Sequence, residues 1–114
     1  MIITLPKAPT NNTYYRHSCR SGSLHSYISP KGREWLYSAG WELKRQYKAQ
    51  KEPVTGLYVV NYTISQDIDA PLKALLDLTE DMGIIENDKQ YTFLQVRKEI
   101  VKHRIDECIK IEFI

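Results

Sequence analysis

Apolar and polar positions follow strand-like patterns in several stretches of the chain. Residues 2–5 form a short apolar run that Pro6 ends, which predicts a first or edge strand. Residues 54–64 are rich in Tyr, Val and Thr and carry apolar or aromatic side chains on both faces, which predicts a central strand. Residues 91–102 alternate weakly and residues 107–114 alternate cleanly, so we expect two further strands there.

Two other stretches have helical spacing. Ser29 and Pro30 are typical of a helix start, with Ser as the N-cap and Pro in the first turn. This helix is expected to run to about residue 50, with an apolar face made of Leu36, Ala39, Leu43 and Tyr47. A second helix is predicted from Asp69, as N-cap, to about Met82, with Gly83 at the following position that tolerates a left-handed backbone.

The elements therefore follow the order strand, helix, strand, helix, strand, strand. The polar residues 7–25 are predicted to be a loop, with a tip at residues 21–23. This order indicates an α+β fold in which a small mixed β-sheet carries two helices on one side. A chain of 114 residues has the size of one domain, so we predict a single domain over residues 1–114.

The composition excludes several classes of protein. With 42% hydrophobic and 26% charged residues, the chain is neither disordered nor of low complexity. Its apolar runs are far shorter than the roughly 20 residues that a membrane helix needs. The two cysteines, Cys19 and Cys108, are too few for a disulfide framework. No basic segment followed by a long apolar run is visible near Met1, so we expect a cytoplasmic protein that does not contact membranes.

Charge is distributed unevenly along the chain. The net charge is only +2, but residues 1–51 carry nine basic and two acidic side chains, and residues 52–114 carry seven basic and twelve acidic ones. A chain of this kind can present a cationic face to a polyanion such as nucleic acid and still form a local acidic pocket. The alternative is a lysine-rich helix face that is merely solvated.

The acidic residues of the second half show a notable spacing. Asp67 and Asp69 flank one residue in a segment expected to leave a strand in an extended conformation, so both carboxylates can face the same way. Lys73 and Asp77 follow at intervals of four residues, along one flank of the second predicted helix. A turn after that helix can return Asp88 to the same end of the sheet.

Such a cluster suits a hard divalent cation. Mg²⁺ prefers oxygen ligands and takes one or two carboxylates while it keeps several waters. A bound ion can activate water and orient a phosphodiester, and a nearby ammonium can stabilise the charge that develops. The alternative is structural: Asp69 is only a helix cap, and Lys73 and Asp77 form only surface ion pairs.

A second group of residues mixes aromatic rings and cations near the amino terminus. Tyrosines and basic side chains together can stack on bases and bind phosphates. The alternative places the two tyrosines in the core and leaves Arg16 solvated. We expect Trp35 and Trp41 to belong to the core or to a dimer interface. The predicted DNA-binding residues are Asn12, Tyr14, Tyr15, Arg16 and Lys31.

Two segments resemble one known family. Residues 5–17, Leu-Pro-Lys-Ala-Pro-Thr-Asn-Asn-Thr-Tyr-Tyr-Arg-His, are similar to a Pro-Pro-Ser-Asn-x-x-Tyr-Arg signature. The pattern Asp67-x-Asp69-x-x-x-Lys73-x-x-x-Asp77, with Asp88 further on, is similar to the acidic core of the same family, the RusA Holliday junction endonucleases. The order and spacing agree over nearly the whole chain, which implies a RusA-like fold.

The resemblance also implies an activity. Such a protein is a homodimeric nuclease, dependent on Mg²⁺ or Mn²⁺, that makes paired nicks across four-way DNA junctions during recombination and repair. Proteins of this kind are typically carried by phages and prophages, and so act in a bacterial host cell.

Residue by residue, the resemblance makes Asp67, Asp69 and Asp88 the metal-site carboxylates and Lys73 the catalytic lysine. Asp77 would orient its neighbours. One position departs from the family pattern, because Ala70 stands directly after Asp69 where the family often has Asn. The alternative function is therefore a junction- or DNA-binding protein of the same fold that does not cleave.

Overall fold

The computed structural model describes the backbone of residues 1–20 and 23–114, and the side chains of residues 1–10, 13–15 and 27–114. Four strands form the main sheet, and they lie in the order β1-β6-β4-β5. β6 pairs antiparallel with both β1 and β4, whereas β4 and β5 are parallel. The predicted central strand and the predicted edge strand are both confirmed. Their bounds are β1 Ile3–Pro6, β4 Gly56–Thr63, β5 Phe93–Ile100 and β6 Cys108–Phe113.

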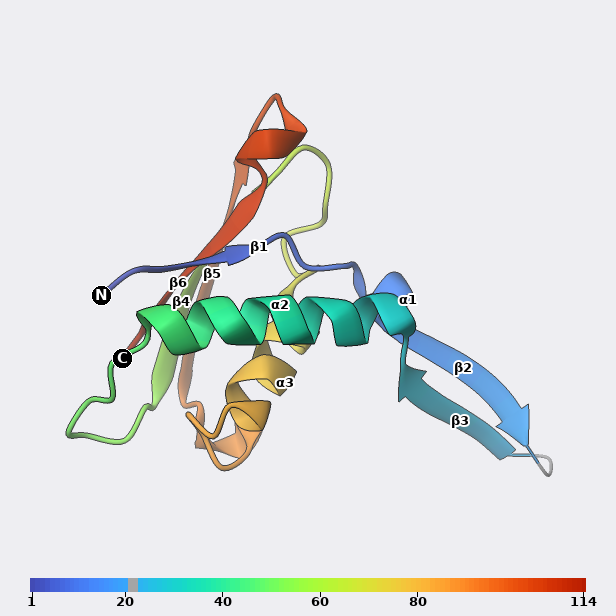
Figure 1. The fold of residues 1–114 in the computed structure, drawn as a ribbon, viewed down its shortest axis with the longest axis horizontal. Helices are drawn as coiled ribbons and strands as arrows, with labels where there is room; N and C mark the ends of the chain where they lie inside the picture. Colours follow the sequence, from blue (N-terminus) through green and yellow to red (C-terminus); the bar gives the residue numbers. More distant parts are fainter. Residues whose placement is uncertain (21–22) are drawn as a thin grey trace.

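The parallel pair determines the path of the chain. Gly56 lies beside Phe93, and Thr63 lies beside Ile100, so the two strands begin at one end of the sheet and finish at the other. Parallel neighbours need a crossover connection, and helix α3 (Leu72–Asp81) provides it. The chain thus leaves β4 at its carboxyl end and returns through α3 to the amino end of β5 (Figure 1).

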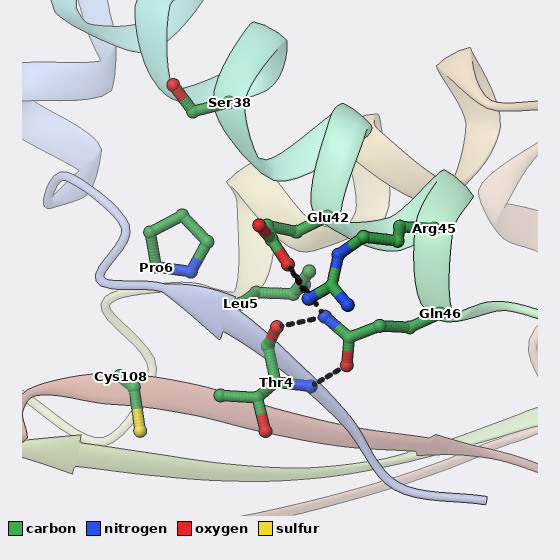
Figure 2. Close-up of a pocket in the computed structure, with 8 residues that line it drawn as sticks. All are labelled: Thr4, Leu5, Pro6, Ser38, Glu42, Arg45, Gln46 and Cys108. Atoms are coloured by element: carbon green, nitrogen blue, oxygen red, sulfur yellow. Dashed lines mark hydrogen bonds and ion pairs between the residues drawn. The ribbon is translucent and has the colours of Figure 1, made fainter.

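Helix α2 spans Pro30–Gln46 and begins as the sequence predicts. The Ser29 side chain accepts a hydrogen bond from the backbone N–H of Gly32 at 3.0 Å, and Pro30 occupies the first turn. The helix ends four residues earlier than expected, because Tyr47 has an extended backbone. Gln46 then fastens the edge strand, since its side-chain amide bonds both the N–H and the C=O of Thr4 at 2.9 and 2.8 Å (Figure 2).

Helix α3 begins later than predicted and ends where expected. Its N-cap is Pro71 rather than Asp69, and no side chain caps it. At the other end Gly83 has φ 73°, the left-handed conformation that the sequence indicated. The N–H of Ile84 donates to Thr79 and that of Gly83 donates to Glu80, both at 3.0 Å, which is the Schellman arrangement that closes a helix.

The core lies between the sheet and the two helices. Both α2 and α3 cover the same face of the sheet, and the opposite face carries partly exposed tyrosines and charged residues. This arrangement confirms the predicted α+β fold with two helices on a small mixed sheet. The largest fully buried core residues are Tyr14, Ile3, Leu5, Leu43, Leu57, Leu75, Leu78, Ile109, Ile111 and Val59.

The stretch predicted as a loop instead contains regular structure. A single helical turn, α1 (Asn11–Tyr14), leads into strands β2 (Tyr15–Arg20) and β3 (Ser23–Ile28), which pair antiparallel. This hairpin projects from the body of the molecule (Figure 1). A two-stranded sheet that leaves the core has little need of apolar alternation, so its sequence resembles a loop. Among the described residues, no helix is long and apolar enough to cross a membrane.

Candidate functional site

The two segments that resemble the RusA family meet at the carboxyl end of β4. Gln66 follows this strand, is buried, and donates a hydrogen bond from Nε2 to the carbonyl of Ala8 at 2.9 Å. Asn61, fully buried in β4, donates from Nδ2 to Oε1 of Gln66 at 3.1 Å. A chain of buried amides therefore holds the amino-terminal loop against the end of the strand.

Glu107 makes a second connection between the same segments. Its carboxylate lies 2.9 Å from Nζ of Lys7 and accepts hydrogen bonds from the N–H of Ile64 and the hydroxyl of Thr63. The hydrogen bond from Lys7 is the main cause that lowers the pKa of Glu107, and the Ile64 amide adds to it. The loop that contains Lys7 is thus fixed by charge as well as by amide hydrogen bonds.

Asp77 lies at the centre of a third connection. The hydroxyls of Tyr14 and Tyr15 donate to the same oxygen of Asp77 at 3.0 and 2.8 Å, and the two rings meet edge to face at 4.8 Å. Burial, followed by the nearby Asp77 charge, raises the pKa of Tyr14 well above its usual range. Burial and the Asp77 hydrogen bond raise the pKa of Tyr15 to about 12. Both hydroxyls therefore remain protonated donors at neutral pH.

The other oxygen of Asp77 lies 3.9 Å from Nζ of Lys73, one helical turn away. The Asp77 side chain is 21% exposed and that of Lys73 is 46% exposed, so the ion pair lies at the rim of the core. This cluster of Tyr14, Tyr15, Lys73 and Asp77 joins the tyrosines of the amino-terminal segment to the lysine of the acidic segment. Asp77 is therefore more central than its predicted orienting role indicated.

Helix α2 determines where this cluster lies. The Ser29 hydroxyl donates to the carbonyl of Thr13, and the Ser29 N–H donates to the carbonyl of Tyr14 at 2.8 Å. A Cβ atom on Gly32 would lie 2.9 Å from the same Tyr14 carbonyl. The first turn of α2 thus packs directly on the tyrosine backbone, and only a glycine fits there without displacement.

Asp67 and Asp69 lie in the connection from β4 to α3, before the helix that carries Lys73 and Asp77, and both are exposed. The sequence analysis expected an extended segment here, but the structure shows turns instead. The N–H of Ala70 donates to the carbonyl of Asp67, and the N–H of Leu72 donates to that of Asp69, both at 3.1 Å. These bonds form two successive turns, because the chain must reverse within a few residues to enter α3.

Asp88 does not lie where the sequence analysis expected it. It begins the short helix η1 (Asp88–Gln90), directly before β5, and Gln90 donates from Nε2 to the carbonyl of Val54 at 2.8 Å. Asp88 is therefore held at the amino ends of β4 and β5, whereas Asp67 and Asp69 follow the carboxyl end of β4. Helix α3, which alone spans about 15 Å, lies between them.

This separation determines what one chain can bind. Among the described residues, no group of three or more His, Cys, Asp or Glu side chains is arranged to hold a metal ion. The three predicted carboxylates thus do not fit a common ion within a single copy. Asp67 and Asp69 remain at one end as two exposed oxygen donors, a number that Mg²⁺ accepts.

The predicted DNA-binding residues differ in how far the structure exposes them to solvent. Tyr14 is fully buried, so its ring has no free face for a base. Tyr15 is partly buried, and Lys31 is exposed at the start of α2. The side chains of Asn12 and Arg16 lie outside the described residues. Trp35 belongs to the core, whereas Trp41 is exposed.

Sequence reasoning missed several residues that build the site. Asn61, Gln66 and Glu107 fix the loop that contains Lys7, and Ser29 does more than cap α2. The available signal was a buried-strand pattern that contains the amide of Asn61 and is followed by a second amide, Gln66, three residues after the strand ends. The groove between α2 and β1 in Figure 2 contains none of the predicted site residues.

These features define a class of protein: a small α+β domain in which a tyrosine segment and an acidic segment with one lysine meet at one end of a mixed sheet. No model of a known protein family matches the chain. A curated protein does: the crossover junction endodeoxyribonuclease RusA of Aquifex aeolicus (strain VF5) is 30% identical over 115 residues, covering 90% of this chain and 82% of the relative. The chain therefore belongs to the RusA family of crossover junction endodeoxyribonucleases.

Proposed function

We propose that this chain resolves four-way DNA junctions as a homodimeric, Mg²⁺-dependent endonuclease, with Mn²⁺ as an alternative ion, by hydrolysing one phosphodiester in each of two strands. The observation that carries the proposal is the meeting of the two family segments, in which Tyr14 and Tyr15 bond Asp77 beside Lys73. Membership of the RusA family supports the same activity.

The proposed metal ligands are Asp67, Asp69 and Asp88. A bound divalent ion supplies Lewis acidity and an activated water to phosphodiester hydrolysis. The first two carboxylates are exposed in the connection that leads into the helix of Lys73, so a phosphate can approach them from solvent. Asp67 and Asp69 would supply two carboxylates to the ion, and Asp88 lies at the opposite end of the sheet of the same copy.

Lys73 is the proposed catalytic lysine. Its ammonium can stabilise negative charge on the phosphate or on the leaving 3′-oxygen. Asp77 is a positioning residue, because it holds the lysine through one oxygen and accepts both tyrosine hydroxyls through the other. Two donors on one oxygen restrict the rotation of the carboxylate, which in turn restricts the ammonium.

The proposed DNA contacts come mainly from the basic first half of the chain. Lys31 is exposed at the start of α2, two residues after Ser29, whose N–H donates to the carbonyl of Tyr14. Each phosphate that such residues neutralise releases counterions, so the logarithm of the junction affinity should fall with the logarithm of salt with a slope of about −0.9 per phosphate.

A synthetic four-way junction tests the proposal. The wild-type protein should cut it in Mg²⁺, and Asp67→Asn should abolish cutting while binding stays the same or becomes tighter, since a negative charge near DNA is removed. Glu52→Gln removes an exposed carboxylate from the connection between α2 and β4 and should leave cutting unchanged. Persistent cutting by Asp67→Asn would show that the metal ligands are assigned wrongly.

A second candidate function is junction binding without cleavage. The observation that favours it is Ala70, which is buried and has no polar side chain where the family often has an amide. An amide at that position would support the neighbouring carboxylates, and the loss of such support commonly reduces activity about 10- to 100-fold. Tight junction binding with no cutting in either Mg²⁺ or Mn²⁺ would select this function instead.

A further inference from the structure

Helix α2 exposes two large aromatic side chains to solvent. Tyr37 and Trp41, one helical turn apart, are 70% and 59% exposed. We propose that this side of α2 binds unpaired nucleotides of single-stranded DNA, with bases stacked on the two rings and phosphates bound by the basic residues around them. The site is separate from the proposed metal site and uses no residue of the Asp77 cluster.

The order of residues along the helix produces a continuous ridge. Four exposed residues follow one another at intervals of four positions and therefore share one side of α2. These residues, which we call the α2 ridge, are Arg33, Tyr37, Trp41 and Arg45. At a rise of 1.5 Å per residue the ridge extends over about 18 Å. The two rings thus lie between two basic residues, one toward each end of the helix.

The rings of the α2 ridge keep free faces. Their centroids are 6.4 Å apart and their planes meet at 77°, so the edge of one ring approaches a face of the other. Such a pair covers at most one ring face, and the high exposure of both side chains leaves the other faces accessible. An aromatic face can stack on any unpaired base, whereas the bases of duplex DNA are already stacked on one another. The rings therefore favour single strands over duplexes.

A groove beside the rings has room for one base. Its volume is about 300 Å³, and it is lined by Leu36, Tyr37, Gly40, Trp41, Lys44 and Met82. This volume is at the lower end of the range for small-molecule pockets. Gly40 has no side chain to fill the groove, since a Cβ there would already lie 3.4 Å from the sulfur of Met82.

The charge of this region favours a polyanion. Residues 30–51, which contain α2 and the segment after it, carry six basic and two acidic side chains. Of the two acidic residues, Glu42 is already paired with Arg45 at 2.6 Å. Nζ of Lys44 lies 5.8 Å from the centroid of the Trp41 ring, so a cation accompanies the ring that would stack on a base.

Other occupants fit this surface less well. A second copy of the chain, related by a two-fold axis through the α2 ridge, would bring the basic residues of both copies together. An acidic peptide would match the charge but has no need of two exposed rings one turn apart. Single-stranded DNA uses both features, because it offers a phosphate and an unpaired base in every nucleotide.

The anisotropy of a fluorescently labelled oligothymidylate tests the proposal in EDTA, where no metal ion is bound. The wild-type protein should bind it, and Trp41→Ala and Tyr37→Ala should each weaken binding about tenfold or more, because a stacked base is lost. Lys44→Ala should lower the slope of log affinity against log salt by about 0.7, the value for one phosphate contact to a single strand. No binding by the wild type, or equal binding by the wild type and both alanine variants, would overturn the proposal.

Two further variants serve as controls. Ile105, in the short helix η2 (Arg104–Asp106), is 92% exposed and lies outside α2, so Ile105→Ala should bind the oligonucleotide as the wild type does. Trp41→Phe keeps a ring and should retain most of the affinity. Tighter binding to a duplex, or equally strong competition by polyglutamate, would show that the surface recognises charge alone. Loss of dimers in Trp41→Ala would assign the surface to a second copy.

Tryptophan fluorescence locates the bound DNA. The chain has two tryptophans, the exposed Trp41 and the buried Trp35, and a base stacked on the exposed indole should quench its emission. This quenching should disappear in Trp41→Phe although the DNA still binds. Quenching that persists in this variant comes from Trp35 and would contradict the proposal. A fully paired four-way junction offers no unpaired base to the α2 ridge, so failure of these tests leaves the proposed cleavage untouched.

Discussion

At the scale of single residues, Asp77 explains how two distant segments form one site. It accepts hydrogen bonds from two tyrosines of the amino-terminal segment and holds the lysine of its own helix. These three partners hold the Asp77 carboxylate between the two segments. The fully buried Tyr14 ring therefore supports the cluster from the core, and the partly buried Tyr15 contacts the same carboxylate.

The tyrosine hydroxyls should make stability sensitive to alkali. Folding raises the pKa of Tyr15 from its ordinary 10.0 to about 12, so the folded protein keeps a proton that the unfolded chain loses. The resulting stabilisation is complete below pH 10 and is lost as pH rises from 10 through 12. Tyr15→Phe should cost about 1 kcal/mol at neutral pH and make the alkaline loss shallower, as urea unfolding at several pH values can measure.

Asp77→Asn provides the companion measurement. It removes the charge that disfavours the tyrosinates but leaves the tyrosines buried. The loss of stability at alkaline pH should therefore become smaller but should not disappear. A Tyr15→Phe protein whose stability falls between pH 10 and 12 as steeply as that of the wild type would contradict this account of the hydrogen bond.

Asp77 should also affect catalysis through Lys73. Because the aspartate positions the ammonium, Asp77→Asn should lower kcat about tenfold and leave junction affinity nearly unchanged. Lys73→Met should lower kcat at least as much. The double variant should then be no slower than Lys73→Met alone, since the aspartate has nothing left to position. Additive losses in single-turnover cutting would show that Asp77 acts independently of the lysine.

At the scale of helices and strands, local sequence signals were sufficient to predict some element boundaries but not others. Ser29 and Gly83 were predictable because a helix cap needs only a few neighbouring residues and a particular backbone angle. The start of α3 was not, because Asp69 is drawn into a turn that the reversal of the chain imposes. The β2–β3 hairpin was missed because its sequence shows no clear alternation of apolar and polar residues, which is the main sequence signal for a strand.

The glycines of α2 test whether this helix positions the tyrosines. A Cβ on Gly32 would lie 2.9 Å from the Tyr14 carbonyl, whereas a Cβ on Gly40 would meet the sulfur of Met82 at 3.4 Å and a methyl group of Leu78 at 3.9 Å. Gly32→Ala should therefore destabilise the fold by about 1–3 kcal/mol and disturb the Asp77 cluster. Gly40→Ala should be neutral or stabilising by up to about 1 kcal/mol, because alanine favours helix.

Urea unfolding of the two variants provides the comparison, and both substitutions add the same methyl group to the same helix. Equal stabilities for Gly32→Ala and Gly40→Ala would mean that the first turn of α2 can move away from Tyr14 at no cost. In that case α2 would not determine the position of the cluster.

At the scale of the whole molecule, the limit of the sequence is the direction of β5. The pattern of strand, helix, strand around α3 is compatible with a turn that brings Asp88 back to Asp67 or with a parallel crossover that sends it to the other end. The resemblance identified the same three aspartates in either case. Only the pairing of Gly56 with Phe93 shows that one copy separates them.

β5 lies at the edge of the main sheet and exposes the apolar side chain of Ile100, so we expect this edge to join the two copies of the proposed homodimer. Ile100→Lys places a charge on an exposed residue of this edge, so it should leave the folded monomer intact but prevent pairing of two copies. We expect sedimentation to show monomers and junction cutting to be lost, with the circular dichroism spectrum unchanged. Trp41→Lys, at an equally exposed residue on α2, should keep both the dimer and the cutting. The reverse result, with monomers from Trp41→Lys and dimers from Ile100→Lys, would place the interface of the proposed homodimer on α2.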